Sequence, residues 1–553
     1  MHEKLFKYKI KLKEIKRNIC AEHQQRSRKL SLPSDPTYYA GVVEFMVSEN
    51  EGSAKASDSY SRMKAIIESN STRDLDILIF PEFVLNDGSF RTYVPDPALN
   101  IAPCEIPNSE FFLTELSCLA RSRQIYLVVN VIEKFFCGND TSVVGRCETS
   151  GLNTYNTNVV FDRQGRVISR YRKTHLYRSE YYSKNTLPQP QIATFTTDFG
   201  VTFGHFICFD MLYWAPAAVL VKELGITDII YPTYWFDELP FLTAVQLQEG
   251  WSFANDINLL AANANYPSEE NSGSGIYAGR LGRLTAVINE ESTTILLTAS
   301  VPKRAYLDSY VVPPVIQPTF EPQLQTPRFT KLALQRDYNV DIFTTVLLSE
   351  DFTTTNETLC YDSEFCCHFQ ATRTAVAGNS SAYEAYRYRL AAYSGSRTTH
   401  QRVDPAALKV CAVLACTNDQ LYSCGHIFPA NVSVANKYYF DVLNVSASFP
   451  LATRRVIMPT SVDGTMLPLP VHTYEWQEVE STNATAISIS LTYPKLDILT
   501  FGIWGNYYTE VESNHNLDPV WQPAQSKNSG AAFVGDVGRL LAPLLLAAVI
   551  KLI

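Results

Sequence analysis

The stretch VTFGHFICFDMLYWAPAAVLVKELG, residues 201–225, decides the fold class. Its first part, 201–209, is an apolar run that predicts a buried strand. Its last part, 215–225, predicts a helix with a proline in the first turn and a glycine as its stop. Cys208 stands between the two, and α/β folds gather their active sites where a strand gives way to a helix. The stretch therefore predicts an α/β domain with a reactive site at this point.

Outward from this stretch, short apolar strands alternate with amphipathic helices. The expected strands are 38–47, 75–80, 125–133, 227–235 and 258–265, the expected helices are 108–123 and 242–257, and hairpins are expected at 156–172 and 282–301. Buried strands mixed with helices favour an α/β layered domain, which we place at residues 38–301.

The composition and the apolar periodicity of the sequence change after this domain. Residues 302–327 contain six prolines and little periodicity, which indicates a linker. Short alternating apolar segments with turn residues between them then predict an all-β domain at 328–522. Residues 1–37 are expected to lie outside the fold, because they carry neither a strand pattern nor the apolar core of a signal peptide.

The cysteines indicate an oxidising compartment. Twelve are present, and setting aside Cys20 and Cys208 leaves ten, which suits five disulfides. Two local pairs are expected, Cys137 with Cys147 and Cys411 with Cys416, and the remaining connectivity is open. The alternative is a reduced cytosolic protein with incidental thiols. No CxxC pair occurs, so neither zinc nor another metal is expected.

Other features of the composition point to a secreted protein without a nucleic-acid partner. The net charge of −9 gives no broad positive field for nucleic acid. Seven Asn-x-Ser/Thr sites would carry glycans in a secreted chain. They are Asn70, Asn139, Asn356, Asn379, Asn431, Asn444 and Asn483.

The C-terminal segment, 523–553, has the order of a glycosylphosphatidylinositol attachment signal. Small residues at 528–532 precede a short spacer and the apolar tail LLAPLLLAAVI at 540–550. The tail is shorter than the ~20 apolar residues of a membrane-spanning helix. We therefore expect a cell-surface protein held by a lipid anchor, with a simple hydrophobic C-terminal helix as the alternative.

Three polar residues follow apolar strands and are candidates for the chemistry. Glu82 closes LDILIFPEF, Lys173 follows VISRYR, and Cys208 follows VTFGHFI. Taken singly, each has a structural reading: a satisfied carboxylate, a solvated basic edge and an inert core thiol. A thiol near a helix N-terminus is shifted toward thiolate, which favours Cys208 as a nucleophile.

These residues resemble a known family. The order of Glu in IFPEF, Lys in RYRKTHL and Cys in FICFDMLYWAPA resembles the Glu-Lys-Cys triad of the nitrilase superfamily. Longer stretches are similar to its vanin and biotinidase branch, and to insect vanin-like proteins in particular. They include NTNVVFDRQGRVISRYRKTHLY, IIYPTYWFDELPFLTAVQLQEGW, NLLAANANYP, GSGIYAG, CYDSEFCCHFQ, KVCAVLACT and YSCGH, so the resemblance extends from Tyr38 to the C-terminus.

The resemblance implies both a fold and a mechanism. The fold would be a nitrilase-type α-β-β-α sandwich followed by a smaller, disulfide-stapled all-β domain. Cys208 would attack a linear amide, Glu82 would act as general base, and Lys173 would stabilise the oxyanion. Glu180 falls where many nitrilase-type enzymes place a second glutamate that orients the lysine. No metal or organic cofactor is expected.

The substrate is less closely defined. The resemblance implies pantetheine, cleaved to pantothenate and cysteamine, or biotinyl amides and esters. Tyr234, Trp235 and Phe236 are candidates for the wall of the acyl pocket, although aromatic side chains there are equally ordinary core residues. Transfer of the acyl group to an amine is an alternative to hydrolysis. A further alternative is a surface binding or adhesion protein on an inactive nitrilase scaffold.

Two positions near the nucleophile depart from the family pattern. Ala215 stands where relatives carry an acidic residue before the proline, and His205 stands where an aliphatic residue is usual. His205 is interpreted as a satisfied strand residue rather than as a ligand.

Overall fold

The structure is a computed structural model that describes residues 30–107, 109–138, 147–309, 329–376, 383–399 and 402–508. Cys20, Asn139, Asn379, the attachment signal and most of the predicted linker lie outside these ranges. Among the residues that the structure does describe, no helix is long and apolar enough to cross a membrane.

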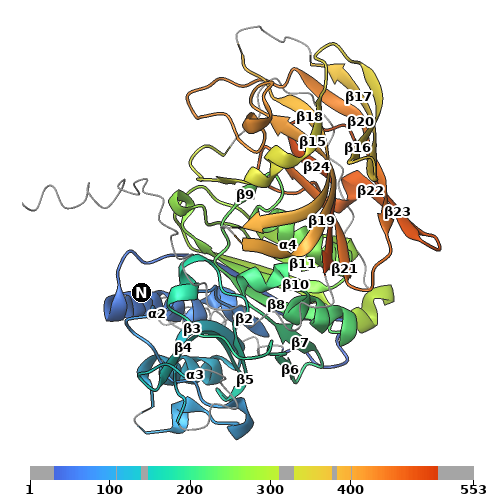
Figure 1. The fold of residues 1–553 in the computed structure, drawn as a ribbon. Coiled ribbons are helices and arrows are strands. Elements are labelled where there is room, and N and C mark those ends of the chain that lie inside the picture. The colour runs from blue at the N-terminus through green and yellow to red at the C-terminus, as the bar shows by residue number, and fades with distance from the viewer. Residues whose placement is uncertain are drawn as a thin grey trace, which may run out of the picture. The chain divides into compact units, whose positions relative to one another are not determined.

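The N-terminal part of the chain forms a network of twelve strands with two halves (Figure 1). The first half has the order β13-β1-β2-β3-β4-β5 and the second the order β12-β11-β10-β8-β7-β6, and β1 joins them by pairing with β10 over two residues. The strands of the first half are β1 (Thr37–Met46), β2 (Ile77–Ile79), β3 (Tyr126–Phe136), β4 (Leu152–Phe161), β5 (Val167–Arg172) and β13 (Ile295–Pro302). Those of the second are β6 (Thr194–Thr196), β7 (Thr202–His205), β8 (Asp228–Thr233), β10 (Asn258–Asn265), β11 (Ser274–Ala278) and β12 (Arg283–Val287).

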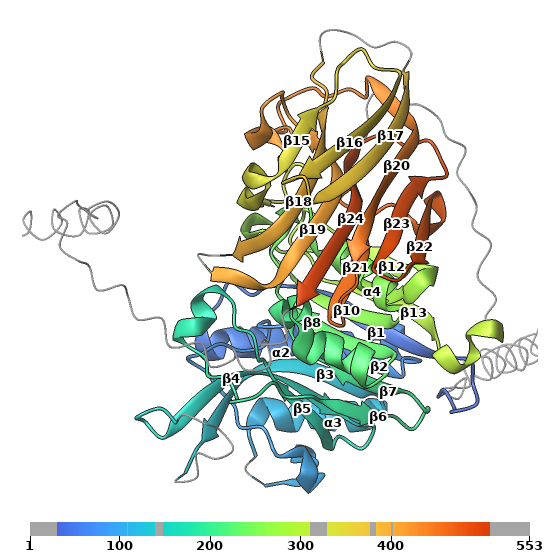
Figure 2. The ribbon, with the colours of Figure 1, turned by 45° about the vertical axis from the view of Figure 1, so that its right-hand side comes forward.

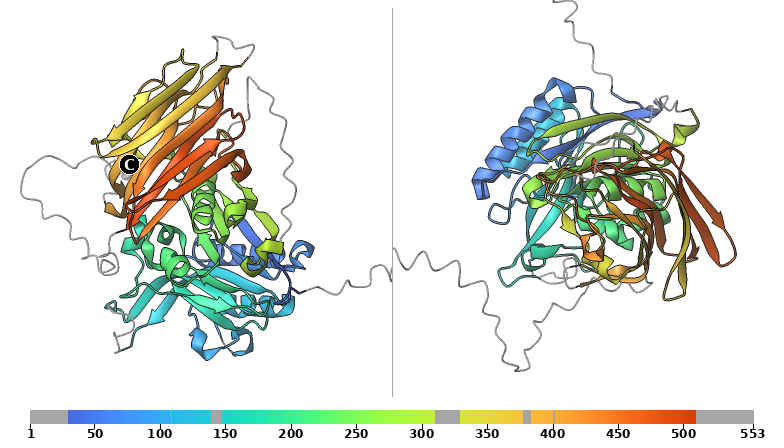
Figure 3. Two further views of the ribbon diagram at one scale, coloured as in Figure 1. Left: turned by 90° about the vertical axis from the view of Figure 1, so that its right-hand side faces the viewer. Right: turned by 90° about the horizontal axis from the view of Figure 1, so that it is seen from above.

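The two halves face each other and helices cover their outer faces. Val42, Ile79 and Val128 of the first half share one buried cluster with Ile230 and Leu260 of the second. The helices α2 (Gly52–Glu68) and α3 (Phe111–Arg123) lie side by side and bury their apolar faces on the first half (Figure 3). The helix α4 (Ala244–Asn255) and a π-helix, Trp214–Glu223, pack on the second half. This is the expected α-β-β-α sandwich.

Three sequence expectations need correction. The predicted hairpin 282–301 does not form, because β12 pairs with β11 whereas β13 crosses to the other half and pairs with β1. The predicted strand 201–209 is shorter, since β7 ends at His205. The helix α2 was missed, although Ala56, Tyr60 and Met63 recur at helical spacing on its buried side.

The start of the described chain contacts the first half of the network. The Ser31 hydroxyl donates to a carboxylate oxygen of Asp76 at 2.6 Å, and Lys303 Nζ donates to the carbonyl of Leu32 at 2.6 Å. Residues directly before β1 therefore pack on the fold, although the sequence indicated no structure for them.

The C-terminal part is a sandwich of two antiparallel five-stranded sheets (Figure 2). One has the order β15-β18-β19-β24-β21 and the other β16-β17-β20-β23-β22. The strands are β15 (Thr344–Leu347), β16 (Thr354–Tyr361), β17 (Phe365–Ala375), β18 (Arg387–Thr399), β19 (Arg402–Cys416), β20 (Tyr438–Pro450), β21 (Arg455–Asp463), β22 (Tyr474–Glu480), β23 (Ala484–Leu491) and β24 (Ile498–Tyr508). Apolar residues from both sheets form the core between them.

Five disulfides form among the described residues, and Cys208 is a free, buried thiol. The bonds are Cys104–Cys118, Cys137–Cys147, Cys360–Cys366, Cys367–Cys411 and Cys416–Cys424. The pair Cys137–Cys147 is confirmed, and the pair Cys411–Cys416 is wrong. Both of those cysteines lie on the extended strand β19, where five residues span roughly 16 Å, well beyond the ~7 Å that a disulfide allows between Cα atoms.

The α/β part and the sandwich share one hydrophobic cluster, with α4 at its centre. Trp251 of α4 lies in the same cluster as Met458 and Trp504 of the sandwich. Gln246 Nε2 donates to Thr460 Oγ1 at 2.8 Å. Gly250 lies so close to β21 that a Cβ atom there would be 2.7 Å from the carbonyl oxygen of Pro459. Because that neighbour is backbone, the contact requires glycine.

We expect Gly250→Ala to lower the free energy of unfolding by about 1–2 kcal/mol, because overpacking outweighs the gain in helix propensity. Gly88→Ala is the matched control, since a Cβ at Gly88 meets only the end of the Lys184 side chain, at 3.9 Å. Urea denaturation of both variants measures the difference. Equal stability of Gly250→Ala and the wild type would contradict the close packing of α4 on β21.

Candidate active site

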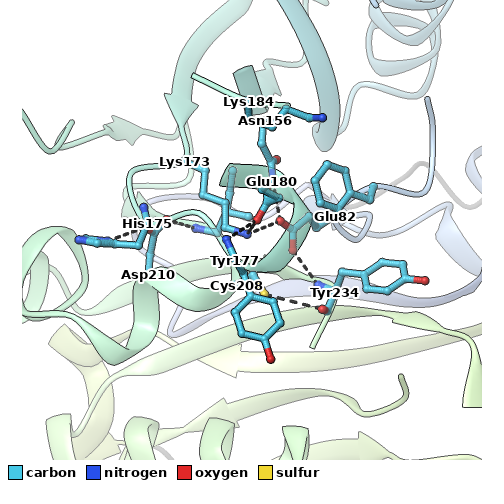
Figure 4. A network of polar contacts seen from close by, with 12 residues as sticks. Glu82, Asn156, Lys173, His175, Tyr177, Glu180, Lys184, Cys208, Asp210 and Tyr234 are labelled. Atoms are coloured by element: carbon cyan, nitrogen blue, oxygen red, sulfur yellow. Dashed lines mark hydrogen bonds and ion pairs between the residues drawn. The ribbon is translucent and has the colours of Figure 1, made fainter. Parts of the chain in front are cut away.

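Glu82, Lys173 and Cys208 come together although they are far apart in the sequence (Figure 4). Glu82 lies just beyond β2, and Lys173 directly follows β5. Cys208 begins a short 3-10 turn, Cys208–Leu212, three residues after β7 ends. The three side chains are buried. Each of the three residues thus lies just after the end of a strand, as the sequence predicted.

Lys173 is held between two carboxylates. Its Nζ lies 2.8 Å from Glu82 Oε1 and 2.6 Å from Glu180 Oε2. Asn156, on β4, donates through Nδ2 to Glu82 Oε1 at 2.6 Å and to Glu180 Oε1 at 2.8 Å. The backbone N–H of Tyr234 donates to Glu82 Oε2 at 2.8 Å. Glu180 therefore lies against Lys173, at the place that the family resemblance implied, and Glu82 has partners on both oxygens.

Burial and charge shift the protonation equilibria of this cluster. Burial raises the pKa of Glu82, Lys173 opposes that shift, and Glu180 adds to it. Burial alone would lower the pKa of Lys173, but Glu180 and Glu82 raise it well above its ordinary value. The site therefore holds a permanent ammonium beside a carboxylate that accepts a proton more readily than an exposed glutamate does.

Cys208 adopts a left-handed backbone conformation, with φ of +48°. Its Sγ lies 3.8 Å from the carbonyl oxygen of Tyr234, and its own carbonyl accepts a hydrogen bond from the Tyr231 hydroxyl at 2.9 Å. Burial raises the pKa of the thiol well above its ordinary value, and Glu82 adds to the rise, whereas Lys173 lowers it. The expected shift toward thiolate is thus wrong, because desolvation and a nearby carboxylate outweigh the effect of the turn that follows.

Asp210 connects the segment after Lys173 to the turn that carries Cys208. Its Oδ1 accepts hydrogen bonds from the backbone N–H of His175 at 2.8 Å and lies 2.8 Å from His175 Nδ1 (Figure 4). Its Oδ2 accepts from the Tyr171 hydroxyl at 2.7 Å and from the Ile207 N–H at 3.1 Å. A single buried carboxylate therefore fixes the spacing between the lysine and cysteine segments.

A cavity opens beside Cys208, and about 360 Å³ of space lies between its walls when the open solvent at its mouth is included. Its lining residues are Tyr177, Cys208, Phe209, Leu212, Trp235, Phe236, Glu238, Leu242 and Arg397. Trp235 and Phe236 thus stand in the wall of this cavity. Tyr234 contributes its backbone to the cluster, and its ring packs against Phe83 with centroids 6.4 Å apart.

Several residues of the site were not found from the sequence. Asn156 had a signal, because an amide in a buried strand is costly unless it has partners. Asp210 had a weaker one, since it lies two residues after Cys208. Glu238 and Arg397 gave none, because only the folded chain brings them to the cavity.

His205 lies on β7 behind the site. Its Nε2 is 2.7 Å from Ser169 Oγ, and its ring packs edge-on against Tyr171 and Phe195. Burial lowers the pKa of His205 to about 3. The residue is thus a neutral part of the core with one hydrogen-bonded nitrogen.

Two family comparisons agree with this architecture. Residues 50–304 match the carbon-nitrogen hydrolase family, and residues 332–511 match the Vanin C-terminal domain. Together, the fold and the family match define a carbon–nitrogen hydrolase of the nitrilase type, an enzyme that hydrolyses amide bonds other than peptide bonds.

Closer relatives define the branch. The chain is 40% identical over 499 residues to Vanin-like protein 1 of Drosophila melanogaster, covering 87% of this chain and 88% of the relative. It is 30% identical over 450 residues to the pantetheinase of Canis lupus familiaris, with 76% and 81% covered, and 32% identical over 394 residues to that of Homo sapiens, with 68% and 72% covered. The chain belongs to the vanin-like family.

Among solved structures, the chain is similar to Nit3 of Saccharomyces cerevisiae, a member of the nitrilase superfamily. The TM-score is 0.38 at 17% identity, with 51% of this chain and 95% of that chain covered.

We expect His205 to make the fold less stable as the pH falls. The unfolded chain takes up a proton near pH 6.5, whereas the folded chain does so only near pH 3, so stability is lost as the pH falls below 6.5. Relative to His205→Gln, which does not titrate, the wild type should lose about 1 kcal/mol between pH 6 and pH 5. Urea denaturation at each pH measures this, and parallel curves would contradict a buried neutral histidine.

Proposed function

We propose that this enzyme hydrolyses pantetheine to pantothenate and cysteamine, with Cys208 as the nucleophile. The proposal rests on the buried cluster of Glu82, Lys173 and Cys208 beside a mostly apolar cavity. Pantetheine is named as the substrate because several relatives of the chain are pantetheinases. A reactive thiol, a base and a fixed cation at one cavity are the parts that acyl transfer from an amide requires.

The first half of the reaction forms an acyl-enzyme. Because burial keeps the thiol protonated, Glu82 takes its proton as Cys208 Sγ bonds to the amide carbon. The electron pair of the carbonyl moves to oxygen, and the Lys173 ammonium stabilises that oxyanion. The intermediate then collapses with cleavage of the C–N bond, and the departing amine takes the proton from Glu82. A thioester on Cys208 and a free amine result.

Water completes the cycle by the same route. Glu82 accepts a proton from the water molecule as its oxygen bonds to the thioester carbon. When the C–S bond breaks, sulfur regains a proton from Glu82, and the free acid leaves. Glu180 supports both halves as a positioning residue, because it shares the Lys173 ammonium with Glu82 and so fixes where the cation lies.

We also place this activity outside the cell. Five disulfides form among the described residues, which suits an oxidising compartment. Asn70, Asn356, Asn431 and Asn483 are exposed glycosylation sequences. The C-terminal sequence supports a glycolipid anchor. The test of the anchor is whether a phosphatidylinositol-specific phospholipase releases the protein from cells.

We expect Cys208→Ala to abolish hydrolysis while the protein stays folded, because the substitution removes one buried sulfur atom and no hydrogen-bond network. Release of amine from pantetheine and from biotinyl amides should fall by at least about a thousandfold. Circular dichroism and thermal unfolding check the fold. Turnover that survives in the folded variant would contradict the nucleophile, and release from biotinyl amides alone would replace pantetheine as the substrate.

We expect Glu180→Gln to shift the acid limb of activity to lower pH. The acid limb of the pH profile reports protonation of Glu82. Burial raises the pKa of Glu82 and Glu180 raises it further, so the midpoint of the limb in the wild type lies above the ordinary glutamate value of 4.5. Removing the charge of Glu180 lowers that pKa, and activity then persists at lower pH. The pH profile of kcat/KM measures the shift; Glu115→Gln, distant from the cluster, is the control. An unmoved limb would contradict Glu82 as the base.

A further inference from the structure

One charged side chain in the wall of the active-site cavity comes from the C-terminal sandwich. Arg397 lies on β18, yet it lines the cavity beside Cys208 together with Glu238 of β9 (Glu238–Leu239). The guanidinium forms an ion pair with the Glu238 carboxylate, and its Nε lies 3.3 Å from Asp337 Oδ2. The side chain of Arg397 is 4% exposed and that of Glu238 is 16% exposed, so the pair is largely shielded from solvent.

The pair stands out because the rest of the lining is apolar or aromatic. Among the described lining residues, Glu238 and Arg397 are the only charged side chains. Phe209, Trp235 and Leu242 are buried side chains of the same wall. A mostly apolar pocket with a few placed polar groups is the usual form of a site that selects a small ligand by its polar end.

We propose that Glu238 and Arg397 bind the polar end of the acyl group, so that the sandwich takes part in substrate selection. The inference rests on the proposed function and names the acyl class: an uncharged, hydroxyl-bearing acyl group. The Glu238 carboxylate accepts hydrogen bonds from hydroxyl groups, and the Arg397 guanidinium donates to hydroxyl or carbonyl oxygens. Pantothenate carries two hydroxyl groups and an internal amide at that end.

The charges of the pair and of Asp337 disfavour an anionic acyl end. The single positive charge of Arg397 meets two carboxylates, those of Glu238 and Asp337. An anionic acyl end would face an excess of negative charge in a desolvated wall, where repulsion is weakly screened. Hydroxyl groups can share the donors and acceptors of the pair without adding a charge.

The pair also has a structural role, because it ties β18 to the loop that carries Trp235 and Phe236. A test must therefore distinguish recognition of the substrate by the pair from stabilisation of the fold by the pair. A substrate analogue that lacks both hydroxyl groups of the pantothenoyl part does so. Loss of structural support lowers kcat/KM for pantetheine and for the analogue by the same factor, whereas loss of recognition lowers it for pantetheine alone.

The experiment measures kcat/KM for both substrates with the full-length enzyme, Glu238→Gln and Arg397→Lys. The wild type should prefer pantetheine by about tenfold or more, as expected when a site loses hydrogen bonds to a substrate hydroxyl. Each variant should reduce that preference toward one, mainly through KM. Arg397→Lys retains the charge and remains informative if Glu238→Gln folds poorly.

Glu249→Gln and Arg283→Lys are the matched controls. Arg283 Nη1 lies 2.8 Å from Glu249 Oε2 in a similarly buried ion pair that does not line the cavity. Their preference for pantetheine should equal that of the wild type. A wild-type enzyme without preference, or variants that keep it, would overturn the role of the pair while leaving the hydrolase intact. A wild type that cleaves neither pantothenoyl amide would instead overturn the proposed function.

Discussion

The buried ammonium of Lys173, shared by Glu82 and Glu180, is the interaction on which the site depends. Removing a charge from water costs several kcal/mol unless close partners compensate for it. Here the compensation is two carboxylates within 2.8 Å of Nζ and an amide from Asn156 that joins the two. Two of these side chains follow the ends of β2 and β5, Asn156 lies within β4, and Glu180 lies in a short turn, so the cluster depends on the packing of β2, β4 and β5 in the first half of the strand network.

The second constraint is the close packing of the sandwich on the α/β part. The contact of Gly250 with the Pro459 carbonyl brings β21 directly onto α4, and the shared hydrophobic cluster continues from there. The same packing carries Arg397 to the cavity that holds Cys208. The sandwich therefore contributes a side chain to the wall of the cavity beside Cys208.

The sequence predicted the strand ends well and the long-range contacts poorly. The positions of Glu82, Lys173 and Cys208 after apolar strands made them candidates, and it was the resemblance to the Glu-Lys-Cys order of the nitrilase superfamily that selected these three. The raised pKa of Cys208 could not be predicted, since it depends on burial by side chains that are distant in the sequence. The disulfide between Cys367 and Cys411 joins the two sheets of the sandwich, and the pairing of β13 with β1 crosses the α/β part. Arg397 shows the same limit, because no local pattern marks a residue that another domain brings to the site.

We propose that Cys208 rests as a buried, protonated thiol and is activated by Glu82 only during the reaction. The most direct test of this proposal is the pH dependence of alkylation of Cys208 by iodoacetamide, followed by intact mass with Cys208→Ala as the blank. We expect slow alkylation at neutral pH and a rate that rises about tenfold per pH unit through pH 9, without a plateau. A fast rate that is already constant near pH 7 would show a preformed thiolate and contradict activation of the thiol by Glu82.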